Sequence, residues 1–239
     1  MDLTKAGFPG PKRVFNGEHG YFKLIENDDY DILYLQENIG KLWMVNQLAH
    51  KPFPSGRLTH GLVHAIKDLK SKHGLNKDDI ESIECFVPPG VYKLVARPII
   101  DNLTTNYSKL CAKFVGASFM INDHLNIETF TEKKYLNNKD TLNFAKKITM
   151  IKNDKLDQKV LTPQKFIITL VNNSKIEINI DHVYGHPKAP LSEKEYLEKF
   201  SKCCFSSTNK VDQNQVNRML DFIFDLENKD NVIDFFKTI

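Results

Sequence analysis

Two prolines that bracket a single residue constrain this chain more than any other feature. Pro52 and Pro54 fix φ and favour extended geometry in the residues before them, so a helix cannot begin before Pro54. Beyond them apolar residues recur at steps of three and four, which predicts an amphipathic helix that Ser55 caps and that ends at His73-Gly74. These apolar residues are Leu58, Leu62, Val63, Ile66 and Leu69.

The other face of this helix is basic. Arg57, His60, His64 and Lys67 follow one another at steps of three and four, and Lys51 stands just before the prolines. Free backbone N–H groups and the helix dipole attract anions to a helix N-terminus, so Lys51 and Arg57 predict an anion site there. The alternative is a solvated basic face that binds nothing.

The chain predicts an α+β fold. Alternation or short apolar runs predict strands over 42–45, 80–87, 145–151, 166–171 and 176–180, with a hairpin turn at Asn172-Asn173-Ser174. Helices are expected over 21–39, 107–121 and 126–136, and from the capping box Ser192-x-x-Glu195 onward to about 205, over 212–226 and from 230. We therefore expect an α+β domain over 40–185, flanked by loop and short helices over 1–39 and by helices over 186–239.

Composition excludes several classes of protein. The 239 residues are 41% hydrophobic and 26% charged, which is typical of a globular chain. A net charge of +3 is too small to predict a nucleic-acid partner. No apolar run reaches the ~20 residues of a membrane span, and the first residues have no signal-peptide core, so no membrane partner is expected.

The four cysteines indicate a reduced, cytoplasmic protein. Cys85 and Cys111 are isolated in the sequence, and the vicinal pair Cys203-Cys204 is poorly suited to a disulfide. No C-x-x-C spacing is present, so zinc and iron–sulfur sites are not expected.

Five collinear segments resemble the MmgE/PrpD family of 2-methylcitrate dehydratases, cis-aconitate decarboxylases and related enzymes. The clearest is Lys51-Pro52-Phe53-Pro54-Ser55-Gly56-Arg57, continued by Thr59-His60-Gly61, which is similar to the family's lysine-proline-aromatic-proline segment. The others are Gly7-Phe8-Pro9-Gly10-Pro11, the segment 106–114, Ile127-Glu128-Thr129-Phe130, and 185–192 followed by Lys199-Phe200.

The resemblance implies a smaller α+β lid domain, flanked by remnants of an all-helical domain. In the family the glycine-proline loop that here occupies residues 7–11 lies mid-chain, so the sequence is similar to the C-terminal half of a member. It would then be part of a split or truncated enzyme, the alternative being a complete small protein. Exposed apolar faces on the flanking helices would seek a partner, either a second copy in a homodimer or a separate helical N-terminal half.

The resemblance also implies chemistry without a cofactor on a small di- or tricarboxylate. Lys51 matches the family lysine and is the catalytic candidate, for carboxylate binding or proton transfer. Arg57, His60 and Lys113 are the substrate-binding candidates, and a surface role is the alternative for Lys51 and Arg57. His60 and His64 have a metal-ligand spacing but no glutamate between them, and no metal is expected.

Two departures from the family pattern bear on the reaction. Gly56 stands where the decarboxylase branch has a histidine, and Phe114 stands where many members have a tyrosine. Both weaken cis-aconitate decarboxylation as the reaction and leave a 2-methylcitrate dehydratase-like lyase or isomerase. Since other catalytic groups of the family lie in its helical half, this chain alone is not expected to turn over substrate. The alternative function is an inactive remnant or assembly module that keeps the lid fold.

Overall fold

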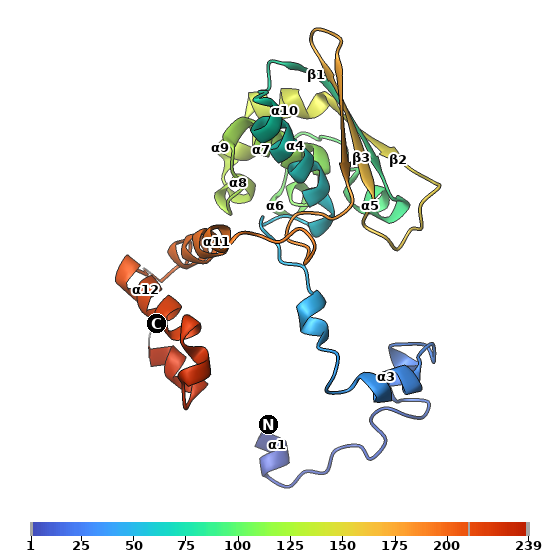
Figure 1. Cartoon of the computed structure of the whole chain (residues 1–239), viewed down its shortest axis with the longest axis vertical. Helices are drawn as coiled ribbons and strands as arrows, with labels where there is room; N and C mark the ends of the chain where they lie inside the picture. The colour runs from blue at the N-terminus through green and yellow to red at the C-terminus, as the bar shows by residue number, and fades with distance from the viewer. Residues whose placement is uncertain (1, 210, 238–239) are drawn as a thin grey trace. The chain divides into compact units, whose positions relative to one another are not determined.

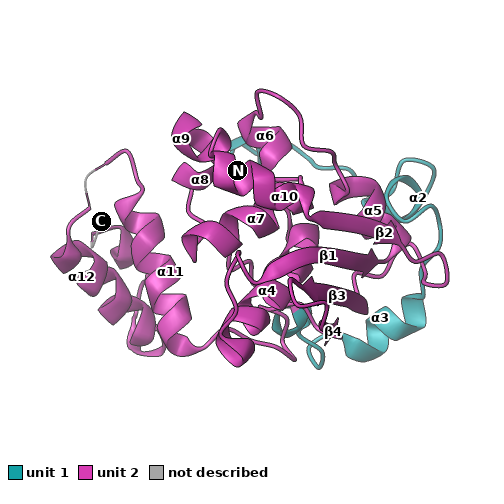
Figure 2. Ribbon diagram, turned by 90° about the horizontal axis from the view of Figure 1, so that it is seen from above, with its two compact units in different colours: residues 1–47 teal, residues 48–239 magenta. Residues whose placement is uncertain are grey.

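The computed structural model describes residues 2–209 and 211–237 and divides the chain into two compact units (Figure 2). Unit 1 is residues 1–47 and unit 2 is residues 48–239. The three-part division predicted from the sequence, with borders after residues 39 and 185, stays a prediction.

Unit 2 is built on a four-stranded mixed sheet, which confirms the α+β class. The strand order is β2-β1-β3-β4; β1 pairs parallel with β2 and antiparallel with β3, and β3 pairs antiparallel with β4. The strands are β1 (Ile80–Val87), β2 (Ile148–Lys152), β3 (Gln164–Leu170) and β4 (Lys175–Ile180). Asn173, with φ +67°, lies in the β3–β4 hairpin turn, as the sequence predicts.

Three helices lie against one face of this sheet (Figure 1). They are α4 (His60–His73), α7 (Ala112–Asn122) and α10 (Lys139–Lys146). The alternate residues Ile83, Cys85 and Val87 of β1 are buried, and α4 buries Leu62, Val63, Ala65, Ile66 and Leu69. This shared apolar layer is the core of unit 2.

The remaining helices of unit 2 are short or lie toward its C-terminal end. The short ones are α5 (Pro89–Val95), α6 (Thr105–Ser108), α8 (Glu128–Thr131) and α9 (Lys133–Leu136). The C-terminal ones are α11 (Glu193–Phe205), α12 (Gln213–Phe224), η3 (Leu226–Asn228) and η4 (Val232–Lys237). The capping box predicted for Ser192 and Glu195 is confirmed at the start of α11.

Four local expectations are wrong. The helix expected over 107–121 is two helices, α6 and α7, separated by residues 109–111. Residues 42–45 are not a buried strand: Trp43 is 65% exposed and η1 is Met44–Gln47, because no strand within residues 2–209 and 211–237 pairs with this apolar run. Ser55 does not cap α4, because its hydroxyl bonds Thr59 Oγ1 at 2.9 Å and a 3-10 turn, η2 (Arg57–Thr59), intervenes. Ala145 lies in α10, not in a strand.

Unit 1 has almost no interior. Its helices are α1 (Asp2–Lys5), α2 (Tyr21–Leu24) and α3 (Ile32–Asn38), and among residues 2–47 only Gly20 is buried. The rings of Phe22 and Tyr30 stack with centroids 4.0 Å apart, while Leu24, Ile25 and Leu33 face outward. Across the described part of the chain, every helix lacks the length or the apolar character that a membrane crossing requires.

Candidate functional site

The proline segment of unit 2 lies directly against the loop that follows β4. The His50 backbone N–H donates to Gly185 O at 2.8 Å, which brings Lys51 next to residues 185–186. Gly185 has φ +88°, and a Cβ built there would lie 2.1 Å from His50 O. Only glycine fits this close approach of two backbones.

Arg57 also contacts this loop, through two backbone carbonyls. Its guanidinium donates to Tyr184 O at 2.7 Å and to Val183 O at 3.1 Å. The side chain is half-buried, and this burial lowers its pKa without neutralising it. A guanidinium has five N–H groups, so these two bonds leave donors for a ligand.

His60 is fully buried one turn further on. Its ring meets Phe53 edge to face at 5.3 Å, and its Nε2 has no hydrogen-bond partner. Burial, followed by the charges of Arg57 and Lys51, lowers the pKa of His60 to about 3. The imidazole is therefore neutral at physiological pH, and Lys51 and Arg57 act on one group.

His64 and Lys67 contact Tyr184 of the same loop. The Tyr184 N–H donates to His64 Nδ1 at 3.2 Å, and Lys67 Nζ lies 4.0 Å above the Tyr184 ring centroid. Lys67 also pairs with Glu195 at 2.8 Å, which attaches the first turn of α11 to α4. Burial lowers the pKa of His64; the charge of Asp68 raises it, and the charges of Lys67, Lys72 and Arg57 lower it further.

Glu195 is the acidic partner in this arrangement. Burial raises its pKa, but hydrogen bonds from Lys67, Tyr184 and Ser192 outweigh that effect, and the pKa falls to about 2. Glu195 therefore stays ionised and balances the charge of Lys67. The cations Lys51 and Arg57 are not part of this pair.

The loop itself contributes two histidines. The rings of His182 and His186 stack with centroids 4.7 Å apart and planes inclined by 11°, and the Lys188 N–H donates to His186 Nδ1 at 3.0 Å. Burial lowers the pKa of His186, as do His182, Arg57 and Lys188. The charges that act on His186 thus include the Arg57 guanidinium of the proline segment.

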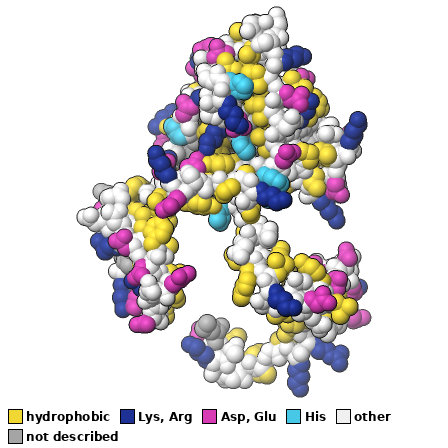
Figure 3. Space-filling model, viewed as in Figure 1, with side chains coloured by type: hydrophobic (Ala, Val, Ile, Leu, Met, Phe, Trp, Pro, Cys, Tyr) yellow, Lys and Arg dark blue, Asp and Glu magenta, His cyan; other side chains and the backbone are white. Residues whose placement is uncertain are grey.

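We call this set of side chains the basic junction. Figure 3 shows histidine side chains beside Lys and Arg side chains on the face in view. The exposed Lys51 amine and the half-buried Arg57 guanidinium supply fixed positive charge. The members of the basic junction are Lys51, Arg57, His60, His64, His182, His186 and Lys188.

The structure thus brings three of the four predicted site residues together. Lys51, Arg57 and His60 interact at the basic junction, while Lys113 is half-buried in the first turn of α7 and acts on the thiols of Cys85 and Cys111. The segment before α7 reaches the junction through Lys109, whose carbonyl accepts the Gly56 N–H at 2.8 Å.

Sequence reasoning missed His186. The spacing His182-x-x-x-His186 is visible in the sequence, but Gly185 and Pro187 rule out a shared helix, so this spacing predicts only loop structure. Within residues 2–209 and 211–237, no group of three or more His, Cys, Asp or Glu side chains is arranged to hold a metal ion.

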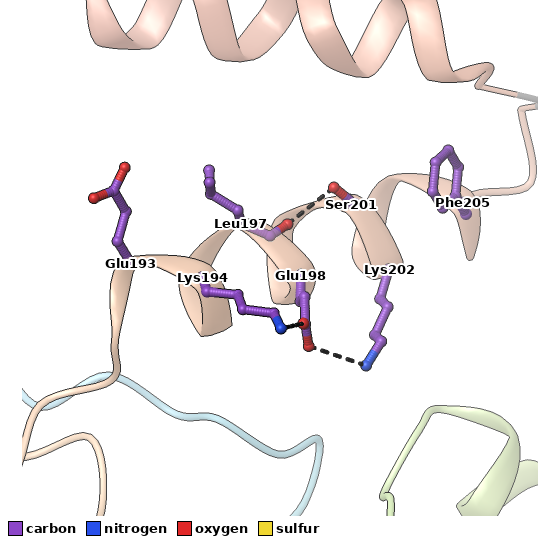
Figure 4. Close-up of a pocket in the computed structure, with 7 residues that line it drawn as sticks. All are labelled: Glu193, Lys194, Leu197, Glu198, Ser201, Lys202 and Phe205. Atoms are coloured by element: carbon purple, nitrogen blue, oxygen red, sulfur yellow. Dashed lines mark hydrogen bonds and ion pairs between the residues drawn. The ribbon is translucent and has the colours of Figure 1, made fainter.

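A separate groove of about 650 Å³ runs along α11 (Figure 4). A single helix lines it, and three of its charges pair with one another: Glu198 lies 4.0 Å from Lys194 and 3.9 Å from Lys202. Paired charges on an open helix face offer little to an anion, so the basic junction is the better candidate site. The lining residues are Glu193, Lys194, Leu197, Glu198, Ser201, Lys202 and Phe205.

Comparison with known families supports the resemblance seen in the sequence. Residues 53–222, more than half of the chain, match the MmgE/PrpD C-terminal domain. This range contains most of the basic junction, including Arg57, His60 and His186, and the whole sheet. A search of curated proteins gave no match. The chain belongs to the MmgE/PrpD family.

Proposed function

We propose that the chain takes part in a lyase or isomerase reaction on a small di- or tricarboxylate, similar to that of 2-methylcitrate dehydratases. The observation that carries this proposal is the basic junction, where the Arg57 guanidinium donates to Tyr184 O and Val183 O, and Lys51 follows His50, whose N–H donates to Gly185 O. A multiply charged acid is the ligand that such a set of cations favours. A cytoplasmic location, with Cys85 and Cys111 reduced, belongs to the same proposal.

The chemistry needs positive charge where negative charge develops. Removing a proton next to a carboxylate creates an enolate-like transition state, and preorganised cations stabilise it. Lys51, which is exposed, would bind a carboxylate or transfer the proton, and the free donors of Arg57 would bind a second carboxylate. His60 would support Arg57 from the interior, and Lys113 remains a candidate for another substrate contact.

Calorimetric titration of the full chain with citrate and tricarballylate tests this site. We expect Lys51→Ala to weaken binding roughly ten- to a hundredfold, because a lost charge-assisted hydrogen bond costs roughly 1.5–3 kcal/mol. The matched control is Lys155→Ala, which removes the same charge from an exposed position between β2 and β3 and should leave affinity unchanged. Equal binding by wild type and Lys51→Ala would remove Lys51 from the site.

A second candidate is an assembly module, and the exposed apolar surface of unit 1 favours it. Ile39 is 77% exposed and Trp43 65%, values that suit a protein contact better than solvent. The partner would be a second copy or a helical domain that carries the other catalytic groups of the family. Light scattering coupled to size exclusion gives the oligomeric state, and co-expression with a family N-terminal domain tests whether activity appears only in the pair.

A further inference from the structure

We propose that His186 is a further ligand-binding residue, which donates a hydrogen bond from Nε2 as a neutral imidazole to one carboxylate of the acid at the basic junction. This inference rests on the proposed function and adds a residue to the site candidates Lys51, Arg57, His60 and Lys113. Its support comes from the hydrogen bonding of the loop 182–189 and from the charges around it.

The first support is the state of the ring. His186 Nδ1 accepts the Lys188 N–H at 3.0 Å, so Nδ1 carries no proton and the neutral ring is protonated at Nε2. Protonating both nitrogens would place an N–H against an N–H and lose this bond. The backbone of the loop itself therefore selects one tautomer.

The second support is the charge around the ring. The groups that act on His186 are the stacked ring of His182, the guanidinium of Arg57 and the amine of Lys188. All three are basic and disfavour a further positive charge, and burial acts in the same direction. The same groups attract an anion, so a carboxylate is favoured near this ring.

The third support is the rigidity of the loop. Val183 O accepts from Arg57 and from the His186 N–H, Tyr184 N donates to His64, and Tyr184 O accepts from Arg57. Gly185 is bonded through its N–H to Ala189 O and through its carbonyl to the His50 N–H. A backbone fixed at each of these groups holds the His186 ring in place before a ligand arrives.

A neutral donor has a defined consequence for the reaction. It binds a carboxylate or polarises an enolate-like oxygen, but it does not give up a proton as an imidazolium would. Proton transfer then stays with Lys51. The lowered pKa of His186, caused first by burial and then by His182, Arg57 and Lys188, favours this neutral form.

Three substitutions separate this role from a structural one. The amide N–H₂ of glutamine can replace an Nε2 donor, whereas the side-chain oxygen of asparagine can replace an Nδ1 acceptor. By calorimetry with tricarballylate we expect His186→Ala and His186→Asn to weaken binding about tenfold and His186→Gln to stay within about threefold of wild type. The control is His73→Ala, an exposed histidine at the end of α4, which should bind as wild type.

Other outcomes would overturn the inference. If His186→Asn binds as wild type and His186→Gln does not, the ring serves only to hold Lys188. If wild-type affinity rises more than tenfold from pH 8 to pH 6 and His186→Gln abolishes that rise, the bound form is charged. If the His186 variants all bind as wild type while Lys51→Ala does not, the inference fails and the proposed function stands. If wild type binds neither tricarboxylate, both fail.

Discussion

His60 shows how strongly a position in the fold changes the properties of a side chain. On the sequence it is one of several basic residues on a helix face, but in the structure it is fully buried between Phe53 and Arg57. Its environment keeps it neutral, with a pKa of about 3. A group whose pKa is depressed by folding stabilises the native state above its unfolded pKa, and this contribution is lost as pH falls toward the folded pKa.

His60 therefore predicts a pH-dependent stability. Between pH 7 and pH 5 the unfolded chain takes up a proton at this residue and the folded chain does not, so His60 should lower the free energy of unfolding by about 2 kcal/mol. In His60→Leu the free energy of unfolding should fall by about 2 kcal/mol less between pH 7 and pH 5 than in wild type, whatever the variant's stability at pH 7. Urea unfolding at the two pH values measures the difference.

The interval from pH 7 to pH 5 lies above the range in which Glu195 loses its contribution. Glu195 has a pKa of about 2 in the folded state and 4.5 as a reference, so its contribution is lost only below this interval. His64 and His186 also have lowered pKa values and remain in both proteins, so they cancel in the comparison. An unchanged pH dependence in His60→Leu would contradict the assignment of a neutral, buried imidazole.

At the scale of elements, the contact between the proline segment and the loop 182–189 decides whether the basic junction exists. Gly185→Ala should lower the free energy of unfolding by roughly 2 kcal/mol or more, because a positive φ and a clash with the His50 carbonyl add together. It should also weaken tricarboxylate binding, since Lys51 and His186 would move apart. Urea unfolding and calorimetry measure the two effects.

Gly74 provides the matched control. It has φ +65° at the end of α4, but a Cβ there would meet nothing within 4 Å. Gly74→Ala should therefore cost only about 1 kcal/mol of backbone strain and leave binding unchanged. Equal losses of stability in the two variants would mean that the approach of His50 to Gly185 does not constrain the fold.

The elements also show which features a sequence can predict. Strand β1, the β3–β4 turn and the capping box of α11 depend on neighbours in sequence, and periodicity or turn chemistry predicts each of them. Residues 42–45 satisfy the same apolar pattern, but a strand also needs a partner, which local sequence does not reveal. Ser55 fails as a cap because its hydroxyl has a closer partner in Thr59.

The candidate site also has a part that local sequence predicts and a part that depends on distant residues. Helical spacing predicts that Arg57 and His60 lie together, because both belong to one local stretch. His186 joins them through contacts between residues more than a hundred positions apart, such as Arg57 with Tyr184 and His64 with Tyr184. Nothing in the spacing of residues 182–189 identifies that partner, so the sequence alone could not place the loop at the site.

At the scale of the whole molecule, the two units differ in how they are stabilised. Unit 2 has a continuous apolar core between its sheet and helices, whereas unit 1 buries only Gly20 among its described residues. Side chains such as Leu33, Ile39 and Val45 remain in solvent, so apolar burial contributes little to holding unit 1 in one conformation. Its local stability should therefore be far below that of unit 2.

Limited proteolysis of the full chain tests this difference. Chymotrypsin has exposed aromatic targets in both units, including Phe15 and Trp43 in unit 1 and Tyr92 in unit 2. We expect cuts in residues 2–47 first and a resistant fragment that contains the sheet, because cleavage requires local opening and unit 1 opens most easily. Protection of both units at high protein concentration, lost on dilution, would instead mean that a second copy covers the apolar surface of unit 1. Protection at every concentration would contradict the weak stability inferred for unit 1.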